Sequence, residues 1–212
     1  MDYTKENLVE YIQKLDTYNL EIGSSGNISF RLPGGLIAIK PSGLTYGEVT
    51  TDNLSIVDEN ARLISGLRPS SDLVFHKAIF DSYKDINCVI HTHSHFAVVM
   101  SMLGKPLEVL TTMHADYFGK SVYCMPYKNH RDADMAKSII ENKERVFIVE
   151  RHGAIISADD PDTAIKKAVI LEEIAALNYH SALINSEIAP LDNATVAKLH
   201  EFYNSSYGNK PK

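Results

Sequence analysis

Hydrophobic residues recur at two different periods along the chain, with no internal repeat. Apolar positions three or four residues apart predict amphipathic helices, with Thr4 capping the first, Ser70 and Ser71 capping the second, and Pro161 opening the longest. These helices are expected at residues 5–20, 73–83, 96–103, 161–183 and 193–203. Short β-rich runs between turn residues predict strands at 27–31, 36–40, 54–57, 88–92, 122–125 and 145–150.

The order of these elements predicts the fold class. Strands gathered early in the chain, with helices inserted among them, favour an α/β fold: a three-layer α/β/α domain around a central mixed, largely antiparallel sheet. No linker rich in Pro, Gly or Ser interrupts the 212 residues. We therefore expect a single domain over residues 1–212, in which 191–212 form a C-terminal helix and tail.

Composition and charge narrow the possible partners. Hydrophobic residues make up 44% of the chain and charged residues 23%, which is typical of a folded globular protein. There are 21 Lys and Arg against 27 Asp and Glu, so the net charge is −6. No basic cluster forms the face that nucleic acid or an acidic membrane requires, and we expect neither partner.

The start of the chain and the cysteines bear on localisation. The polar start MDYTKENLVE lacks the apolar segment of a secretory signal, and no apolar run approaches the roughly 20 residues that span a bilayer. Cys88 and Cys124 are too few for a disulfide framework and have no metal-type CxxC spacing, so reduced core thiols are expected. These observations predict a cytoplasmic protein.

Two histidines one residue apart, His91 and His93, end a predicted strand. Residues i and i+2 of a strand point to one face, so both imidazoles can converge on one ion, although a partly buried structural pair would show the same spacing. His152 stands beside a glycine at the end of a later strand. It is either a third ligand or an ordinary histidine of a surface loop. Three imidazoles with an open fourth position describe a catalytic zinc-type site. Either Asp72 or Asp116 could occupy that position or move protons. Alternatively, Asp72 is only an acidic residue in the first turn of a helix, and Asp116 is only a turn residue.

Three further segments carry donors that suit a phosphate group. Glycine-rich turns and helix starts expose backbone N–H groups that bind phosphate, and a lysine adds positive charge. The residues are Gly26, Asn27, Lys40, Ser42, Gly43, Ser70 and Ser71. Each segment alone would more often be an ordinary loop or cap, but three in one chain with the histidine set predict a phosphorylated substrate.

Five short motifs, in this order and at these separations, resemble the class II sugar-phosphate aldolase/epimerase family, also called the aldolase II and adducin-head family. They are Gly26-Asn27-Ile28-Ser29, Lys40-Pro41-Ser42-Gly43, Pro69-Ser70-Ser71-Asp72, His91-Thr92-His93 and Arg151-His152-Gly153. The resemblance covers about residues 5–185.

The resemblance implies an α/β/α domain that assembles as a cyclic homotetramer with sites at subunit interfaces. It implies a divalent ion, Zn²⁺ or another such as Mn²⁺ or Co²⁺, held by His91, His93 and His152, with Asp72 as a candidate further ligand. It also implies phosphate binding by residues of the three segments: Asn27, Ser42, Gly43, Ser70 and Ser71. Adducin-like structural heads lack the histidine set, so its presence favours an enzyme that acts on a phosphorylated ketose.

Two activities of the family have different sequence patterns. Fuculose-1-phosphate-type aldolases usually have Glu after the paired serines and a catalytic tyrosine near position 112, where this chain has Asp72 and Thr112. Residues 111–118 are similar to the Thr-Thr-His-Ala-Asp-Tyr-Phe segment of L-ribulose-5-phosphate 4-epimerases, whose catalytic Asp matches Asp116. The Tyr-Tyr-Gly ending of those epimerases supplies the partner acid/base, which matches Tyr207.

Other features depart from the epimerase pattern. Met113 is inserted, the segment 128–145 is shorter, and residues 124–127 look more like the aldolases. His200 is similar in place to a histidine of the epimerase C-terminal helix, although the spacing differs. The remaining histidines are expected in structural or supporting roles: His76, His95, His114, His130 and His180.

The favoured hypothesis is a metal-dependent 4-epimerase of a pentulose 5-phosphate, which interconverts L-ribulose 5-phosphate and D-xylulose 5-phosphate by retro-aldol and aldol steps. Breaking the C3–C4 bond leaves an enediolate whose charge a divalent ion neutralises, and reclosure on either face of the aldehyde requires two proton donors, Asp116 and Tyr207. One alternative is a class II aldolase that cleaves a ketose 1-phosphate such as L-fuculose 1-phosphate to dihydroxyacetone phosphate and an aldehyde. Another is a noncatalytic metal-binding scaffold. An iron oxygenase using His91, His93 and Asp72 would leave the phosphate segments without a role.

Overall fold

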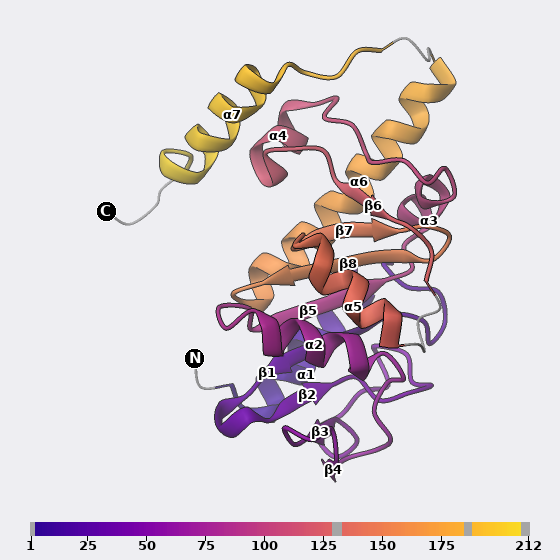
Figure 1. Ribbon diagram of the computed structural model, residues 1–212. Coiled ribbons are helices and arrows are strands. Elements are labelled where there is room, and N and C mark those ends of the chain that lie inside the picture. Colours follow the sequence, from indigo (N-terminus) through magenta and orange to yellow (C-terminus); the bar gives the residue numbers. More distant parts are fainter. Residues whose placement is uncertain (1–2, 129–132, 185–187, 209–212) are drawn as a thin grey trace.

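A computed structural model describes residues 3–128, 133–184 and 188–208, and in these ranges the chain forms a sheet covered by helices on both faces (Figure 1). The sheet has eight strands in the order β4-β3-β2-β1-β5-β8-β7-β6. Neighbouring strands are antiparallel except β6 and β7, which run parallel. The predicted α/β fold with a mixed, largely antiparallel sheet is confirmed.

The elements are short except for one long helix. The strands are β1 (Asn27–Arg31), β2 (Ile37–Ile39), β3 (Ser55–Val57), β4 (Leu63–Ser65), β5 (Cys88–Thr92), β6 (Tyr123–Met125), β7 (Val146–Val149) and β8 (Gly153–Ala158). The helices are α1 (Lys5–Asp16), α2 (Leu73–Ser82), α3 (His95–Ser101), α4 (Thr112–Phe118), α5 (Ala133–Asn142), α6 (Pro161–Ile184) and α7 (Asn193–Ser205), with a 3₁₀ turn at Pro33–Gly35.

Each face of the sheet has its own hydrophobic core, because successive strand residues point to opposite faces. On one face, Cys88 and Ile90 of β5 join residues of α1, α3 and α6. On the other face, Val89 between them joins residues of α2 and α5. Figure 1 shows α2 and α5 in front of the sheet and α6 behind it, so the three layers are clear.

Helices α4 and α7 lie outside these layers and pack on each other at the upper part of the molecule (Figure 1). Their contact contains a separate small cluster of buried residues, Val109, Ala115 and Val196. The side chain of Asp192 caps α7 by accepting from the N–H groups of Ala194 and Thr195. Met113 and Phe118 of α4 also pack against the core on one face of the sheet, which attaches the pair to the domain.

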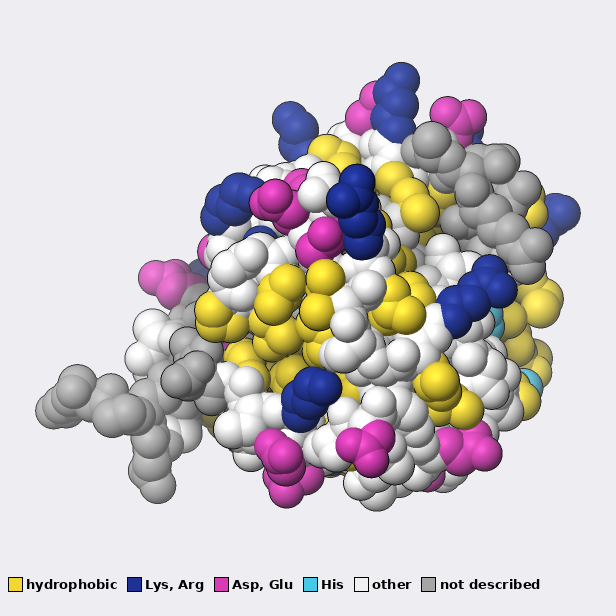
Figure 2. Space-filling model, turned by 90° about the horizontal axis from the view of Figure 1, so that it is seen from below, with side chains coloured by type: hydrophobic (Ala, Val, Ile, Leu, Met, Phe, Trp, Pro, Cys, Tyr) yellow, Lys and Arg dark blue, Asp and Glu magenta, His cyan; other side chains and the backbone are white. Residues whose placement is uncertain are grey.

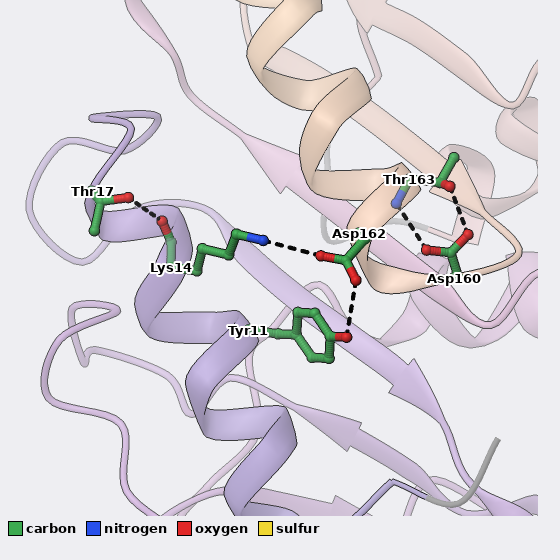
Figure 3. Close-up of polar contacts among 6 residues, drawn as sticks. All are labelled: Tyr11, Lys14, Thr17, Asp160, Asp162 and Thr163. Carbon is green, nitrogen blue, oxygen red and sulfur yellow. Dashed lines mark hydrogen bonds and ion pairs between the residues drawn. The ribbon is translucent and has the colours of Figure 1, made fainter. Parts of the chain in front are cut away.

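Polar contacts join α1 to the start of α6 (Figure 3). Lys14 Nζ lies 3.0 Å from Asp162 Oδ1, and the Tyr11 hydroxyl donates to Asp162 Oδ2 at 3.1 Å. Asp160 accepts from the Thr163 N–H at 2.9 Å, which fixes the turn that begins α6 at the predicted proline. The ion pair is exposed, so it contributes at most about 1 kcal/mol and mainly orients α1.

Several predicted boundaries need correction. Thr4 caps α1 as expected, but the helix ends at Asp16 rather than near residue 20, because Asn19 adopts a left-handed φ of 53°. The N-cap residue of α2 is Asp72 rather than Ser70 or Ser71, and its own side chain accepts no capping hydrogen bond, although Ser70 Oγ accepts from the Asp72 N–H at 3.3 Å. Four elements, β4, α4, α5 and β8, were not predicted at all.

Other predictions concern individual residues. Cys88 and Cys124 are free and buried, as expected of core thiols. Among the described parts of the chain, no helix combines the length and the apolar character needed to cross a bilayer. His130, expected in a structural or supporting role, lies outside the described residues, as do the last four residues of the predicted tail.

Candidate metal centre and phosphate loops

His91 is held in the centre of the sheet. It lies on β5, between Asn27 of β1 and Ile155 of β8 in the strand register, and its side chain is fully buried. Its Nδ1 lies 2.9 Å from the carbonyl oxygen of Ala154. Because a carbonyl can only accept, Nδ1 carries the proton and Nε2 keeps the lone pair that a metal ion needs.

His93 and His152 complete a group of three imidazoles. His93 follows β5, and His152 lies in the connection between β7 and β8, where its N–H donates to the Val149 carbonyl at 3.0 Å. One ligand atom from each histidine lies within 4.8 Å of the other two, and Nε2 of His91 and His93 are 2.9 Å apart. Ligands at about 2.0–2.1 Å from a tetrahedral ion lie roughly 3.3 Å apart, so the donor set fits a divalent ion.

Gly153 explains how the third histidine reaches the other two. A Cβ built at Gly153 would lie 2.2 Å from the Thr92 carbonyl oxygen and 3.0 Å from the His93 ring. No other residue fits there without moving β8 away from β5. The glycine therefore lets the strands approach closely enough for His152 to join the group.

Asp72 is placed beside this group but does not belong to it. Among the described residues, the candidate metal group consists of the three histidines alone. The Asp72 carboxylate is mostly buried, and its Oδ2 accepts from Asn27 Nδ2 at 2.7 Å. Since Asn27 is the strand partner of His91, this hydrogen bond holds the carboxylate next to the histidines.

A fourth buried histidine, His76, supports this region from α2. Its Nδ1 lies 2.6 Å from Ser29 Oγ, which points from the neighbouring strand β1. Complete burial lowers the pKa of His76 to about 3, with the charge of Asp72 opposing the shift. His76 is therefore neutral at physiological pH, as expected of a structural histidine.

The three predicted phosphate segments converge next to the histidines. Lys40 Nζ donates to the Ser24 carbonyl at 3.1 Å, and the Ser70 N–H donates to the Lys40 carbonyl at 3.3 Å. Asn27 Nδ2 also donates to Ser70 Oγ at 3.1 Å. The structure thus brings together parts of the chain that are far apart in sequence, as the phosphate prediction requires.

The members of these segments differ in exposure. Ser42, Gly43 and Ser71 are exposed at the loop tips, whereas Lys40 is almost completely buried. Burial lowers the pKa of Lys40, and the nearby carboxylates, first Glu21, oppose that shift. The side-chain oxygen Oδ1 of Asn27 is buried and has no hydrogen-bond partner in the described residues, so an acceptor is available at the centre of the loops.

Gly26 lies where the phosphate loops meet the metal centre. It has a φ of +69°, and a Cβ there would lie 2.9 Å from the His91 carbonyl oxygen and 3.0 Å from the Tyr46 hydroxyl. Both the backbone conformation and the close approach exclude a side chain. Gly26 therefore lets the loop rest directly on the strand that carries His91.

Two carboxylates that the sequence did not indicate support the site. Glu172 of α6 accepts from the N–H groups of Phe96 and Ala97 at 2.7 and 3.0 Å, which fixes the start of α3 just after His93. Glu21 accepts from the Tyr46 N–H at 3.0 Å, and burial raises its pKa to about 7. No local motif marks either residue, because their partners are distant in sequence.

The predicted acid/base residues lie on α4 and just after α7, in another part of the molecule. Asp116 is in α4, and its carbonyl accepts from His200 Nδ1 of α7 at 2.8 Å. The exposed ring of Tyr207 stacks on Tyr203, which lies next to Tyr117 with ring centroids 4.8 Å apart. Figure 1 shows the α4 and α7 pair displaced from the β7–β8 connection that carries the third histidine.

The chain matches one protein family along most of its length. The family model described as Class II Aldolase and Adducin N-terminal domain matches residues 6–179. The chain therefore belongs to this family, which confirms the resemblance seen in the motifs. Class II aldolases depend on a metal ion, and this chain has a group of three histidines that could bind one.

Individual relatives fall into two activities. L-ribulose-5-phosphate 4-epimerase UlaF of Salmonella paratyphi B is 30% identical over 213 residues, which cover 93% of each chain. L-fuculose phosphate aldolase of Methanococcus maripaludis is 36% identical over 158 residues, covering 74% of this chain and 86% of that one. A solved structure of L-fuculose 1-phosphate aldolase is 25% identical, with a TM-score of 0.86 over 94% of this chain and 95% of that chain. These enzyme relatives confirm the expectation of an enzyme.

Proposed function

We propose that this protein is a metal-dependent epimerase that interconverts L-ribulose 5-phosphate and D-xylulose 5-phosphate by breaking and reforming the C3–C4 bond. The observation that carries the proposal is the position of Asp116 and Tyr207 on one packed pair of helices, α4 and α7 with its C-terminal end. An aldehyde that recloses on either face needs a proton donor on each side. A carboxyl group and a phenol can fill these two roles.

The three histidines would hold the divalent ion, with Zn²⁺ as our first choice and Mn²⁺ or Co²⁺ as others that imidazoles accept. The ion supplies Lewis-acid stabilisation of the negative charge that develops when the carbon–carbon bond breaks. His91 presents an unprotonated Nε2 because Ala154 holds the proton on Nδ1. Asp72, held by Asn27, is proposed to move a proton beside the ion or to ligate it directly.

The phosphate of the substrate is proposed to bind where the three loops converge. Ser42, Ser70 and Ser71 would offer hydroxyl groups, and the backbone at Gly26 and Gly43 would offer N–H donors. Lys40 lies beneath this surface and contributes positive charge from a buried position. An anchored phosphate keeps the aldehyde fragment in place while it rotates.

A homotetramer would bring the two parts of the site together. Since α4 and α7 are displaced from the histidine group in one chain, their acid/base residues would reach the metal centre of a neighbouring chain. Exposed apolar residues support an assembly: Leu63 and Ile64 lie on the edge strand β4, and Leu183 and Ile184 end α6. Figure 2 shows hydrophobic side chains gathered on the face that includes the β4 edge. Patches of this kind commonly mark protein interfaces.

We propose that the enzyme works in the cytoplasm. Cys88 and Cys124 are both free and buried, which suits a reducing compartment. Phosphorylated sugars are also retained inside cells by their charge. We propose two kinds of partner, the substrate and further copies of the chain, and no nucleic acid or membrane.

A class II aldolase is the second candidate. The 36% identity to an L-fuculose phosphate aldolase and the TM-score of 0.86 to an L-fuculose 1-phosphate aldolase favour it. Such an enzyme would anchor a phosphate on C1 and release the aldehyde, so only one proton donor would act on the aldehyde oxygen. The two candidates therefore differ in the need for both Asp116 and Tyr207.

A product assay separates the candidates. The metal-loaded protein is incubated with L-ribulose 5-phosphate, D-xylulose 5-phosphate and L-fuculose 1-phosphate, and sugars are identified by chromatography. Equilibration of the two pentuloses, abolished by a chelator, is the expected result. Fast cleavage of the ketose 1-phosphate without pentulose equilibration would establish the aldolase, and no turnover with a full complement of metal would indicate a scaffold.

A further inference from the structure

A cavity of about 280 Å³ lies at the end of β7 opposite to the histidine group. Val146, the first residue of β7, lines it, whereas His152 lies three residues beyond Val149, the last residue of that strand. Four residues of strand span roughly 10 Å, so the cavity and the metal centre are separate. The cavity is bordered by the end of α4, the end of α5 and the first half of α6.

The charge of this cavity is opposite to that of the whole chain. Four cationic side chains line it, but Glu144 is the one carboxylate among its lining residues, in a protein with a net charge of −6. Lys120 Nζ lies 2.5 Å from Glu144, and Arg145 pairs with Asp85 at 2.7 Å. Within the described ranges, the other two cations, Lys143 and Lys167, form no ion pair, so the cavity keeps an excess of positive charge.

The two unpaired lysines are held in unfavourable settings. Lys167 is partly buried, and loss of solvent lowers its pKa although Asp159 acts against the shift. Lys143 follows the last residue of α5 with a φ of 58°, a left-handed conformation that usually takes Gly or Asn. Lys143 is exposed, so its ammonium is free to meet a ligand, whereas Lys167 is partly buried. A bound anion would offset the desolvation of the Lys167 ammonium and would pair with Lys143.

The lining of the cavity also includes apolar and aromatic side chains. These are Tyr117 and Phe118 at the end of α4, together with Val122 and Val146. A ligand that fits must therefore combine an anionic group with a flat or apolar part. A phosphate ester has this character, since its phosphate carries up to two charges and its substituent can lie against the aromatic rings.

We propose that this cavity is a second anion site, distinct from the metal centre, that binds a small phosphate monoester. The phosphate lies between Lys143 and Lys167, and its substituent packs on Tyr117 and Phe118. His200 of α7 borders the same cavity and donates to the Asp116 carbonyl, so the ligand also bridges α4, α6 and α7. The site does not depend on the reaction proposed for the metal centre.

Calorimetric titration of the full-length protein with phenyl phosphate at low ionic strength tests the site. The wild type should bind at two kinds of site, and Lys143→Gln or Lys167→Gln should weaken one of them at least about tenfold, because each removes a charge-assisted contact. Lys40→Gln should weaken only the other. Inorganic phosphate should bind the second site more weakly than phenyl phosphate, because it cannot use the aromatic wall.

Two controls keep the result interpretable. Lys137→Gln removes an exposed lysine of α5 outside the cavity and should leave both sites unchanged. Lys167→Arg retains the charge and should retain binding, which separates loss of charge from a folding defect. The proposal is overturned if the isotherm of Lys143→Gln and Lys167→Gln equals that of the wild type, or if Lys137→Gln causes the same loss.

Discussion

The histidine group and the α4–α7 pair are built in contrasting ways. His91 is buried in the middle of a sheet, and its ring is fixed by a backbone carbonyl of the neighbouring strand. Tyr207 is 58% exposed and is positioned by stacking on Tyr203. A strand ladder helps to bring the three histidines together within one chain. On the α4–α7 pair, Tyr207 is exposed and Asp116 is partly buried.

The two regions also differ in how firmly they are held. The histidines lie between two extensive cores, one on each face of the sheet. The α4–α7 contact has a small core of Val109, Ala115 and Val196. Local opening is easier where less apolar surface is buried, so we expect faster amide hydrogen exchange in α7 than in β5. Assembly with neighbouring chains would reduce this difference.

The largest expected effect comes from removing a metal ligand. His93→Ala should abolish stoichiometric metal binding and lower kcat/KM by on the order of a thousandfold or more, because the Lewis acid is lost. Elemental analysis and the pentulose assay measure the two effects. His95→Ala, an exposed histidine two residues away, should retain the metal. Full metal content in His93→Ala would show that the histidine group is not the metal centre.

Changes in the α4–α7 pair should separate chemistry from metal binding. Asp116→Asn and Tyr207→Phe should each lower kcat by about 10²–10⁴-fold, the usual range for a general acid or base, while metal content stays at the wild-type level. Tyr123→Phe, another exposed tyrosine, serves as a control with unchanged kcat. Unchanged turnover in both test variants would remove the acid/base assignment.

A smaller effect is expected where the phosphate loop rests on β5. Gly26→Ala should destabilise the protein by about 1–3 kcal/mol and raise KM, because a methyl group there meets the His91 carbonyl at a left-handed φ. Gly23→Ala has a similar φ of +65° but open space around it, so it should cost less. Urea denaturation of both variants measures the difference. If Gly26→Ala and Gly23→Ala destabilise the protein equally, the whole effect comes from the left-handed φ and none from the contact with the His91 carbonyl.

A further effect is a dependence of stability on pH, shared between two histidines. Burial lowers the pKa of His76 to about 3 and of His114 to about 4, one histidine in each region. Their folded pKa values lie below the unfolded value near 6.5, so the stabilisation is complete above pH 6.5 and is lost as the pH falls from there. Each contributes a slope of at most about 1.4 kcal/mol per pH unit.

Urea denaturation of the metal-free protein between pH 7 and 5 checks this slope. His114→Gln should lower the slope by the contribution of one histidine. A slope that His114→Gln does not alter would mean that His114 is protonated in the folded protein.

The pattern of apolar and turn residues predicted the helices and strands whose ends are marked in the sequence. The bounds of β1 and β5 agree with the prediction to the residue, because apolar runs end at distinct turn residues. Strand β8 was missed, since all six of its residues are buried and no alternation marks it. Helix α4 was missed because seven residues are too few to establish a helical period.

Only those features of the candidate site that depend on local spacing were predictable from the sequence. The spacing of His91 and His93 indicates a shared face, but the position of His152 beside them depends on the close approach at Gly153. The burial of Lys40 and the role of Glu172 depend on partners far away in the chain. Sequence patterns identify which residues carry chemistry, and tertiary contacts decide which of them meet.

Mixing two inactive variants tests the division of the site between subunits most directly. His93→Ala lacks the metal centre, and Tyr207→Phe lacks the outward phenol, but a hybrid assembly can pair an intact histidine group with an intact tyrosine from the next chain. Random equal mixing should restore roughly a quarter of the wild-type pentulose equilibration, since that share of head-to-tail interfaces has both intact parts. No recovery in verified hybrid assemblies would contradict a site shared between subunits.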